Sequence, residues 1–194
     1  MSITALILAA GVVAHVSGTA CYLWRTLKGR TKPNRVSFFI WSLAPLIGVS
    51  ASLSDGVGWA ALPVFMAGFG PLLIFGASFV NPNAYWQLRK LDYACGAFSL
   101  LALVLWAITQ DPFWAVFFAI VSDVLASWPT ILKSWRYPET EYFSAYAGAA
   151  FSSLTALIVA ESLKFTEIAF PLMILVACAI ILTGIFRKRL FPQR

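Results

Sequence analysis

Seven long apolar segments, separated by short polar ones, make up most of this 194-residue chain. A helix needs about 20 residues to cross the ~30 Å hydrocarbon layer of a bilayer, and each segment approaches or reaches that length. None shows the strict apolar and polar alternation of a membrane β-strand. The pattern therefore predicts an all-α integral membrane protein with seven transmembrane helices, over residues 2–24, 37–53, 59–80, 93–109, 113–132, 143–160 and 168–186.

The composition agrees with a lipid environment. Hydrophobic residues make up 60% of the chain and charged residues 11%, whereas a soluble domain has roughly 25% charged residues. Too few polar side chains remain to cover a water-exposed surface, which excludes a soluble enzyme, a secreted disulfide scaffold and a disordered chain. The first segment carries no charge before Arg25 and is longer than a signal-peptide core, so we expect a permanent helix.

The distribution of charge predicts the orientation. Thirteen of the fourteen Lys and Arg residues fall within 25–36, 81–92, 133–142 and 187–194, and seven spans place these four segments on one side. The positive-inside rule makes that side cytoplasmic, so the N-terminus lies outside and the C-terminus inside. We expect a bacterial inner (plasma) membrane. Because the basic residues follow topology, they predict no nucleic-acid partner.

Two loops share a layout that predicts an internal repeat. Residues 22–37 and 129–144 each run from an apolar helix end through basic residues and a proline to a serine. Their offset is 107, the difference between 129 and 22. We expect a 3+1+3 parallel repeat of three-helix bundles at 1–80 and 113–194, joined by a linker with the fourth helix at 81–112. Parallel repeats build a site between the halves near the membrane midplane.

The 3+1+3 layout, the outside N-terminus and the segment Pro129-Thr-Ile-Leu-Lys-Ser-Trp-Arg-Tyr-Pro-Glu-Thr-Glu resemble the PQ-loop superfamily, which includes SWEET sugar transporters, cystinosin-type amino-acid exporters and KDEL receptors. By motif, the resemblance covers only the end of the fifth span and the following loop. Pro129 keeps the proline of the Pro-Gln signature, whereas Tyr22-Leu23 keeps neither residue. SWEET sugar pockets use membrane Asn residues, and no predicted span here contains one. The resemblance therefore implies a transporter-like fold without implying a sugar as cargo.

Two ionisable residues lie deep within predicted spans: His15, the only histidine, and Asp123, the only carboxylate far from a span end. Facing lipid would cost each at least ~2.5–3.5 kcal/mol. Adding the offset to 15 gives 122, so both should lie at the same depth in equivalent helices. We expect a direct or water-bridged pair able to exchange a proton near neutral pH. Alternatively, His15 bonds a backbone carbonyl, and Ser122 or Ser127 holds Asp123.

Three prolines are candidate hinges. Pro45, Pro71 and Pro129 each remove a helical hydrogen bond and permit a bend, as alternating access requires. Membrane helices also tolerate proline without any such movement, and the two interpretations stay open.

The loop after the fifth span supplies a candidate cytoplasmic gate. Glu139 and Glu141 could pair with Arg136, Lys133 or the first loop and so close the basic side. The alternative is a solvated helix start that its acidic residues stabilise.

The sequence predicts no metal, cofactor or catalytic site. One histidine and three scattered cysteines do not form a metal site, and catalysis would need Ser122 or Ser127 beside His15. We therefore expect no enzyme. The prediction is a small-solute transporter with protons as a candidate coupling ion, or else a non-transporting receptor or scaffold of the same fold. The expected partners are the lipid bilayer and an unidentified small solute, and the oligomeric state is left open.

Overall fold

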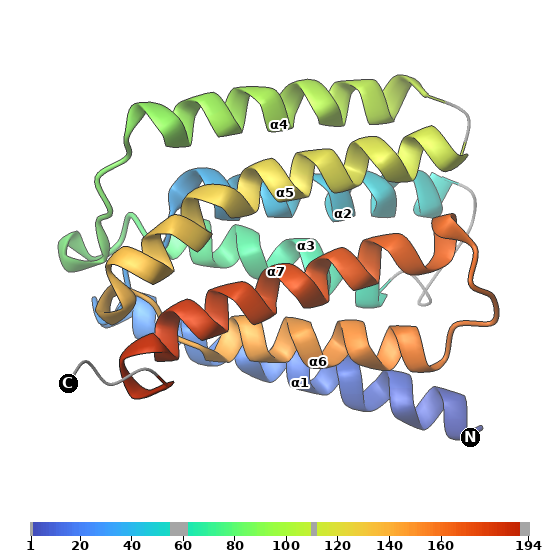
Figure 1. The fold of residues 1–194 in the computed structure, drawn as a ribbon, viewed down its shortest axis with the longest axis horizontal. Helices are drawn as coiled ribbons and strands as arrows, with labels where there is room; N and C mark the ends of the chain where they lie inside the picture. The colour runs from blue at the N-terminus through green and yellow to red at the C-terminus, as the bar shows by residue number, and fades with distance from the viewer. Residues whose placement is uncertain (1, 55–61, 110–111, 191–194) are drawn as a thin grey trace.

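The computed structural model describes residues 2–54, 62–109 and 112–190, and within these ranges the chain forms helices joined by turns (Figure 1). The prediction of an all-α chain is therefore confirmed for the described residues. The expected start of the third span, at residue 59, lies outside them. The helices are α1 (Ile3–Leu27), α2 (Arg35–Ser54), α3 (Leu62–Ala77), α4 (Lys90–Ile108), α5 (Pro112–Arg136), α6 (Ser144–Ile158) and α7 (Phe165–Leu190), with short 3₁₀ turns η2 (Pro82–Ala84) and η3 (Pro138–Thr140).

Four of these helices are long and apolar enough to cross a bilayer: α1, α4, the Val116–Arg136 part of α5 and the Glu167–Leu190 part of α7. Shorter apolar stretches occupy Arg35–Ile47, Phe65–Ala77 and Ser144–Ile158. A helix satisfies its own backbone hydrogen bonds, and this property makes apolar segments stable in lipid. The length and composition of these helices are those of an integral membrane protein.

The two groups of three helices pack in the same order. In the first group α3 contacts both α1 and α2, and in the second group α7 contacts both α5 and α6. Between the groups, α1 packs on α6 and α2 packs on α5. These two crossings are equivalent when α1 is matched with α5 and α2 with α6. Helix α4 packs on α5 and α2 and lies at the edge of the bundle (Figure 1).

Glycines bring α1 and α6 into backbone contact. A Cβ atom added at Gly18 would lie 2.2 Å from the carbonyl oxygen of Ser144, and one at Gly148 would lie 2.6 Å from that of Ala14. The Ser144 hydroxyl donates a 2.8 Å hydrogen bond to the Gly18 carbonyl. Small residues and interhelical hydrogen bonds of this kind join helices in lipid, so this seam is a close contact between the two groups.

The basic segments gather at one end of the bundle, together with the end of α7 (Figure 1, left). The Lys32 amide donates to the Thr140 carbonyl at 2.9 Å. The Asn81 side chain donates to the Leu27 carbonyl at 3.0 Å. The end of α1 and the loop that follows it therefore contact both of the other basic loops, an arrangement that the predicted topology also requires.

The three candidate hinge prolines lie inside continuous helices. Pro45 is within α2, Pro71 within α3 and Pro129 within α5. Any hinge at these positions would therefore be a bend in a helix, since none of them interrupts the helix that carries it.

Candidate functional site

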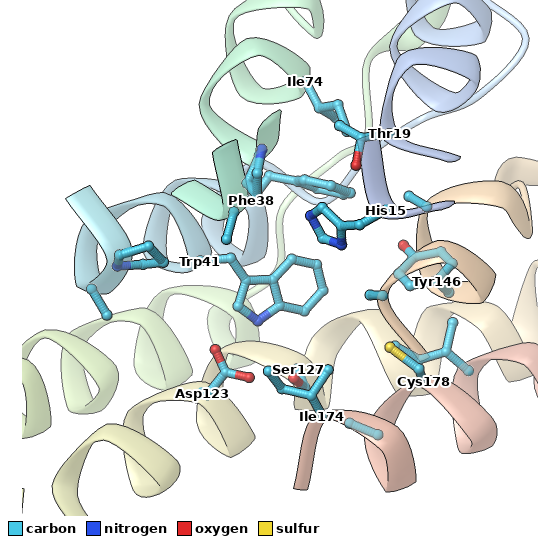
Figure 2. A pocket seen from close by; sticks show the side chains of 18 of the residues that line it. His15, Thr19, Phe38, Trp41, Ile74, Asp123, Ser127, Tyr146, Ile174 and Cys178 are labelled. Carbon is cyan, nitrogen blue, oxygen red and sulfur yellow. The ribbon is translucent and has the colours of Figure 1, made fainter. Parts of the chain in front are cut away.

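A cavity of about 170 Å³ lies between the two groups of helices (Figure 2). At ~30 Å³ for each molecule of liquid water, this is room for roughly five waters or a small solute. All three helices of each group contribute to its wall, and α4 contributes no described residue. The lining residues are His15 and Thr19 of α1; Phe38, Trp41, Ala44 and Pro45 of α2; Ala67, Pro71 and Ile74 of α3; Asp123 and Ser127 of α5; Ala145, Tyr146 and Ala149 of α6; and Phe170, Ile174, Ala177, Cys178 and Ile181 of α7.

The cavity contains both of the deep ionisable residues. His15 enters it from α1 and Asp123 from α5, and the indole of Trp41 lies between them in Figure 2. The structure gives no hydrogen bond or ion pair between these two side chains. Nε2 of His15 is buried and has no hydrogen-bond partner among the described residues. A buried polar atom without a partner is costly, so this nitrogen is available to a water, a proton or a ligand.

The two candidate serines lie on different faces of α5. Ser127 lines the cavity with His15 and Asp123, although no hydrogen bond joins it to His15. Ser122 is buried beside α4, where its carbonyl accepts a 2.9 Å hydrogen bond from the Ser99 hydroxyl. Only Ser127 of the pair therefore belongs to the cavity wall.

The lining residues of the two groups occupy matching positions. His15 and Asp123 differ in number by 108, as do Thr19 and Ser127, and all four line the cavity. On the third helix of each group the difference is 107, and the pairs that line the cavity are Ala67 with Ile174, Pro71 with Cys178, and Ile74 with Ile181. The same faces of corresponding helices therefore form the two halves of the wall.

Aromatic rings cover the cavity on the side of the basic end. Trp41 packs edge-on against Phe38 with ring centres 5.1 Å apart, and Phe38 packs against Tyr22 at 5.4 Å. Tyr22 meets Tyr146 edge-on at 6.0 Å. Tyr22 and Tyr146 are both buried, on the parts of α1 and α6 that adjoin the basic loops. This aromatic layer therefore separates the cavity from the basic surface.

A buried ion pair lies directly behind the aromatic layer. Lys133 of α5 donates to Oε1 of Glu141 at 2.5 Å, and it also bonds the carbonyl of Lys32. Oε2 of Glu141 accepts from the hydroxyls of Tyr22 at 2.7 Å and Tyr146 at 2.9 Å. Lys133 is 3% exposed and Glu141 is 6% exposed. The pair thus joins α1, α5, α6 and the first basic loop through charge-assisted hydrogen bonds, which are stronger than neutral ones.

The other candidate gate residues do not join this cluster. Arg136 and Glu139 are exposed, and the structure gives neither side chain a hydrogen bond or ion pair with a described residue. Of the candidate hinges, Pro45 and Pro71 line the central cavity, whereas Pro129 lines a smaller pocket near the basic end.

A second cavity of about 160 Å³ adjoins the first. It shares His15, Ala67, Ala149 and Ile174 with the first cavity, and it extends along α1 towards Val12. His15 therefore lines both spaces, and on α1 the second reaches farther from the basic end than the first.

Sequence reasoning identified His15, Asp123 and Ser127 but assigned no site role to Trp41, Tyr146 or Cys178. Applying the repeat offset to the third span would have paired Pro71 with Cys178. The cavity position of Trp41 depends on the rotation of α2 about its axis, and the hydropathy of the sequence carries no signal for it.

Comparisons with protein-family models, curated proteins and solved structures give no match to this chain. For the described residues, the fold and the site together define an all-helical protein of membrane type, whose apolar helices line a central cavity with one histidine and one carboxylate in its wall.

Proposed function

We propose that this protein is a small-solute membrane transporter of the PQ-loop or SWEET-like type, located in a bacterial inner membrane. Seven spans form two parallel three-helix repeats, 1–80 and 113–194, and the linker at 81–112 carries the fourth span. The N-terminus is outside and the basic end is cytoplasmic. The observation that carries this proposal is the central cavity, because both groups of helices line it with matching positions.

The packing supports the repeat. Each group places its third helix against both others, and the crossing of α1 with α6 corresponds to that of α5 with α2. A two-fold axis along the membrane normal relates parallel repeats of this kind, and it would pass between the groups, where the cavity lies.

His15 and Asp123 form the proposed proton site. They occupy matching positions in the two groups and face the same space. An ionisable side chain inside a membrane typically marks a substrate or proton pathway. The other titratable side chains that line the cavity are Tyr146 on α6 and Cys178 on α7, and α2 and α3 contribute none among the described lining residues.

The Lys133–Glu141 pair forms the proposed cytoplasmic gate. It holds the aromatic layer over the cavity on the basic side. The space beyond His15 lies on the opposite side, so the structure suits an arrangement closed towards the cytoplasm. Opening would release Glu141 from α1 while bends at Pro45 and Pro71 move the wall of the cavity.

A non-transporting receptor or scaffold of the same fold is the alternative function. A scaffold would be expected to fill its centre with large aliphatic side chains. Among the described residues that line the cavity, alanines are the most numerous and none is leucine. This choice of small side chains preserves a space, which favours transport.

Cys178 provides a test that does not require the solute to be known, because it lines the cavity. A variant with Cys21→Ser and Cys95→Ala leaves Cys178 as the only thiol. A membrane-impermeant methanethiosulfonate is applied to vesicles of each orientation. Alternating access predicts that Cys178 reacts from both sides. The matched control keeps only Cys95, which is buried outside the cavities and should react from neither side.

Labelling of Cys178 from one side only, or from neither, would favour a receptor or scaffold. Ala149→Cys, combined with removal of the native thiols, repeats the test at a second position in the wall. The proton site is tested by the pH dependence of labelling in His15→Gln and Asp123→Asn. An unchanged pH dependence in both variants would remove these residues from the mechanism.

A further inference from the structure

The central cavity has the charge character of a site for a cation. Among the described lining residues, Asp123 is the only carboxylate and none is a lysine or an arginine. The structure gives Asp123 no ion pair with a described residue. A carboxylate in an apolar environment is stable only with a proton, a cation or strong hydrogen bonds. A ligand that supplies positive charge at this position would meet that requirement.

The rest of the wall suits an apolar ligand with an aromatic or aliphatic body. Phe38, Trp41 and Phe170 contribute rings, and Thr19 and Ser127 contribute the side-chain hydroxyls close to the two ionisable residues. A sugar needs hydrogen-bond partners for many hydroxyl groups, and this wall supplies few. A free amino acid would also need a cationic partner for its carboxylate, which the described wall lacks apart from the imidazole of His15.

Trp41 adds a second feature that favours a cation. Its indole lines the same cavity as the Asp123 carboxylate, and it lies between Asp123 and His15 in the view of Figure 2. An ammonium group held over an indole face is attracted by the ring quadrupole, and the attraction is strongest where water is excluded. A carboxylate and an indole in the wall of one small cavity are therefore two independent contributions to ammonium binding.

We propose that the cavity binds a small hydrophobic amine in its ammonium form, with the ammonium on Asp123 and Trp41 and the apolar body towards Phe170 and Ile174. This inference rests on the proposed function for the location of the site and adds the chemical class of the solute. At about 170 Å³, the cavity lies below the ~300–1,000 Å³ typical of pockets for drug-sized ligands. The ligand is therefore a compact amine.

Three probes of nearly equal shape test this assignment. Phenethylammonium carries the charge, 2-phenylethanol replaces the charge with a hydroxyl, and phenylalanine adds a carboxylate. Binding is measured by equilibrium dialysis of radiolabelled probe against the protein in nanodiscs, with empty nanodiscs subtracting partition into lipid. We expect phenethylammonium to bind at least about tenfold more tightly than either of the others, because only it forms an unopposed charge-assisted contact.

Two substitutions test whether Asp123 and Trp41 bind the ammonium group. Asp123→Asn keeps the shape of the side chain and should abolish the preference for phenethylammonium over phenylethanol. Trp41→Leu keeps an apolar wall and should weaken phenethylammonium severalfold while leaving phenylethanol nearly unchanged. If Asp123→Asn does not fold, as judged by size exclusion and thermal unfolding, Trp41→Leu alone decides the question. Equal affinity for the three probes, or a preference that survives both substitutions, would overturn the assignment.

The outcomes separate this inference from the proposed function. Two-sided labelling of Cys178 without a preference for phenethylammonium would retain the transporter and reject the amine. One-sided labelling with a preference that depends on Asp123 would retain the amine site and make the protein a receptor.

Discussion

The buried pair of Lys133 and Glu141 gives the sharpest test of how the basic end is closed. Replacing Lys133 by Met removes the charge and keeps an unbranched side chain that is one atom shorter. Glu141 would then keep the hydroxyls of Tyr22 and Tyr146 as donors but lose its only described cationic partner. At 6% exposure, its carboxylate could not gain enough water in compensation. Breaking a buried pair from one side typically costs about 3–5 kcal/mol.

The converse change, Glu141→Gln, leaves the ammonium of Lys133 unpaired and has an additional cost. A glutamine places an NH₂ group where one carboxylate oxygen now accepts hydrogen bonds, so it faces either the Lys133 ammonium or the two tyrosine hydroxyls. A similar loss of about 3–5 kcal/mol is expected. The double variant removes both buried charges, so it should be more stable than the sum of the single losses predicts, by about 2–3 kcal/mol.

The assay is the free energy of unfolding in mixed micelles titrated with a denaturing detergent, followed by tryptophan fluorescence. Glu139→Gln is the matched control, because Glu139 lies in the same loop as Glu141 but its side chain is exposed. This substitution should change the free energy of unfolding by no more than about 0.5 kcal/mol. A Lys133→Met variant as stable as the parent, or a double variant that equals the sum of the single variants, would refute this account.

The same variants test the gate. If the pair holds the basic end closed, the loss of ~3 kcal/mol shifts the equilibrium between the closed and open states towards the open state by more than about 100-fold. Labelling of Cys178 from the basic side should then accelerate in Lys133→Met, with no comparable change in Glu139→Gln. A loss of stability with unchanged labelling would make the pair a structural element only.

Three further predictions concern the frame around the site. Gly18→Ala should destabilise the fold by about 1–3 kcal/mol or more, because its Cβ would overlap the Ser144 carbonyl, whereas Gly76→Ala meets no atom within 4 Å and should be tolerated in the same unfolding assay. Asn34→Leu should cost about 1–3 kcal/mol, since it removes the 2.6 Å hydrogen bond to buried Asp92. Green fluorescent protein fused to the C-terminus should be fluorescent and alkaline phosphatase fused there should be inactive, because the predicted orientation places that end in the cytoplasm. The reverse result would overturn the orientation.

The helices could be predicted from the sequence because a membrane span requires a long apolar segment, and four of the described helices are long and apolar enough to be such spans. The sequence also indicated His15 and Asp123 as site residues, because ionisable side chains within apolar segments need a partner or a polar space, and both line the central cavity. The offset of 107, obtained from the loops, came within one residue of the 108 that relates these two residues in the cavity wall. That single residue decides whether Ser122 or Asp123 corresponds to His15.

The rotation of each helix about its axis could not be predicted. In a soluble protein, the polar stripe of a helix shows which side faces water. In lipid both the outer and the inner faces are apolar, so the sequence of α2 gives no sign that Trp41 faces the cavity. The partner of Glu141 was also beyond prediction, because Lys133 and Arg136 are both basic, lie three residues apart on α5 and differ mainly in the direction of their side chains.

The two groups depart from an exact repeat in the loops that join their first and second helices. From Thr19 to Phe38 the chain advances 19 positions, and from Ser127 to Ala145 it advances 18, although all four residues line the cavity. The loop in the first group holds Asn34, which bonds Asp92 at the start of α4. The loop in the second group holds Glu141, which bonds Tyr22 of the other group.

These two attachments have different consequences for movement. Asn34 ties its loop to α4, which packs on both α5 and α2, so this bond reaches the second group only through an intermediate helix. Glu141 joins the groups directly, and its hydrogen bond to Tyr22 must break before α1 can separate from the loop that precedes α6. In the proposed transporter, opening at the basic end therefore depends on the second loop, and changes at Glu141 should alter access more than changes at Asn34.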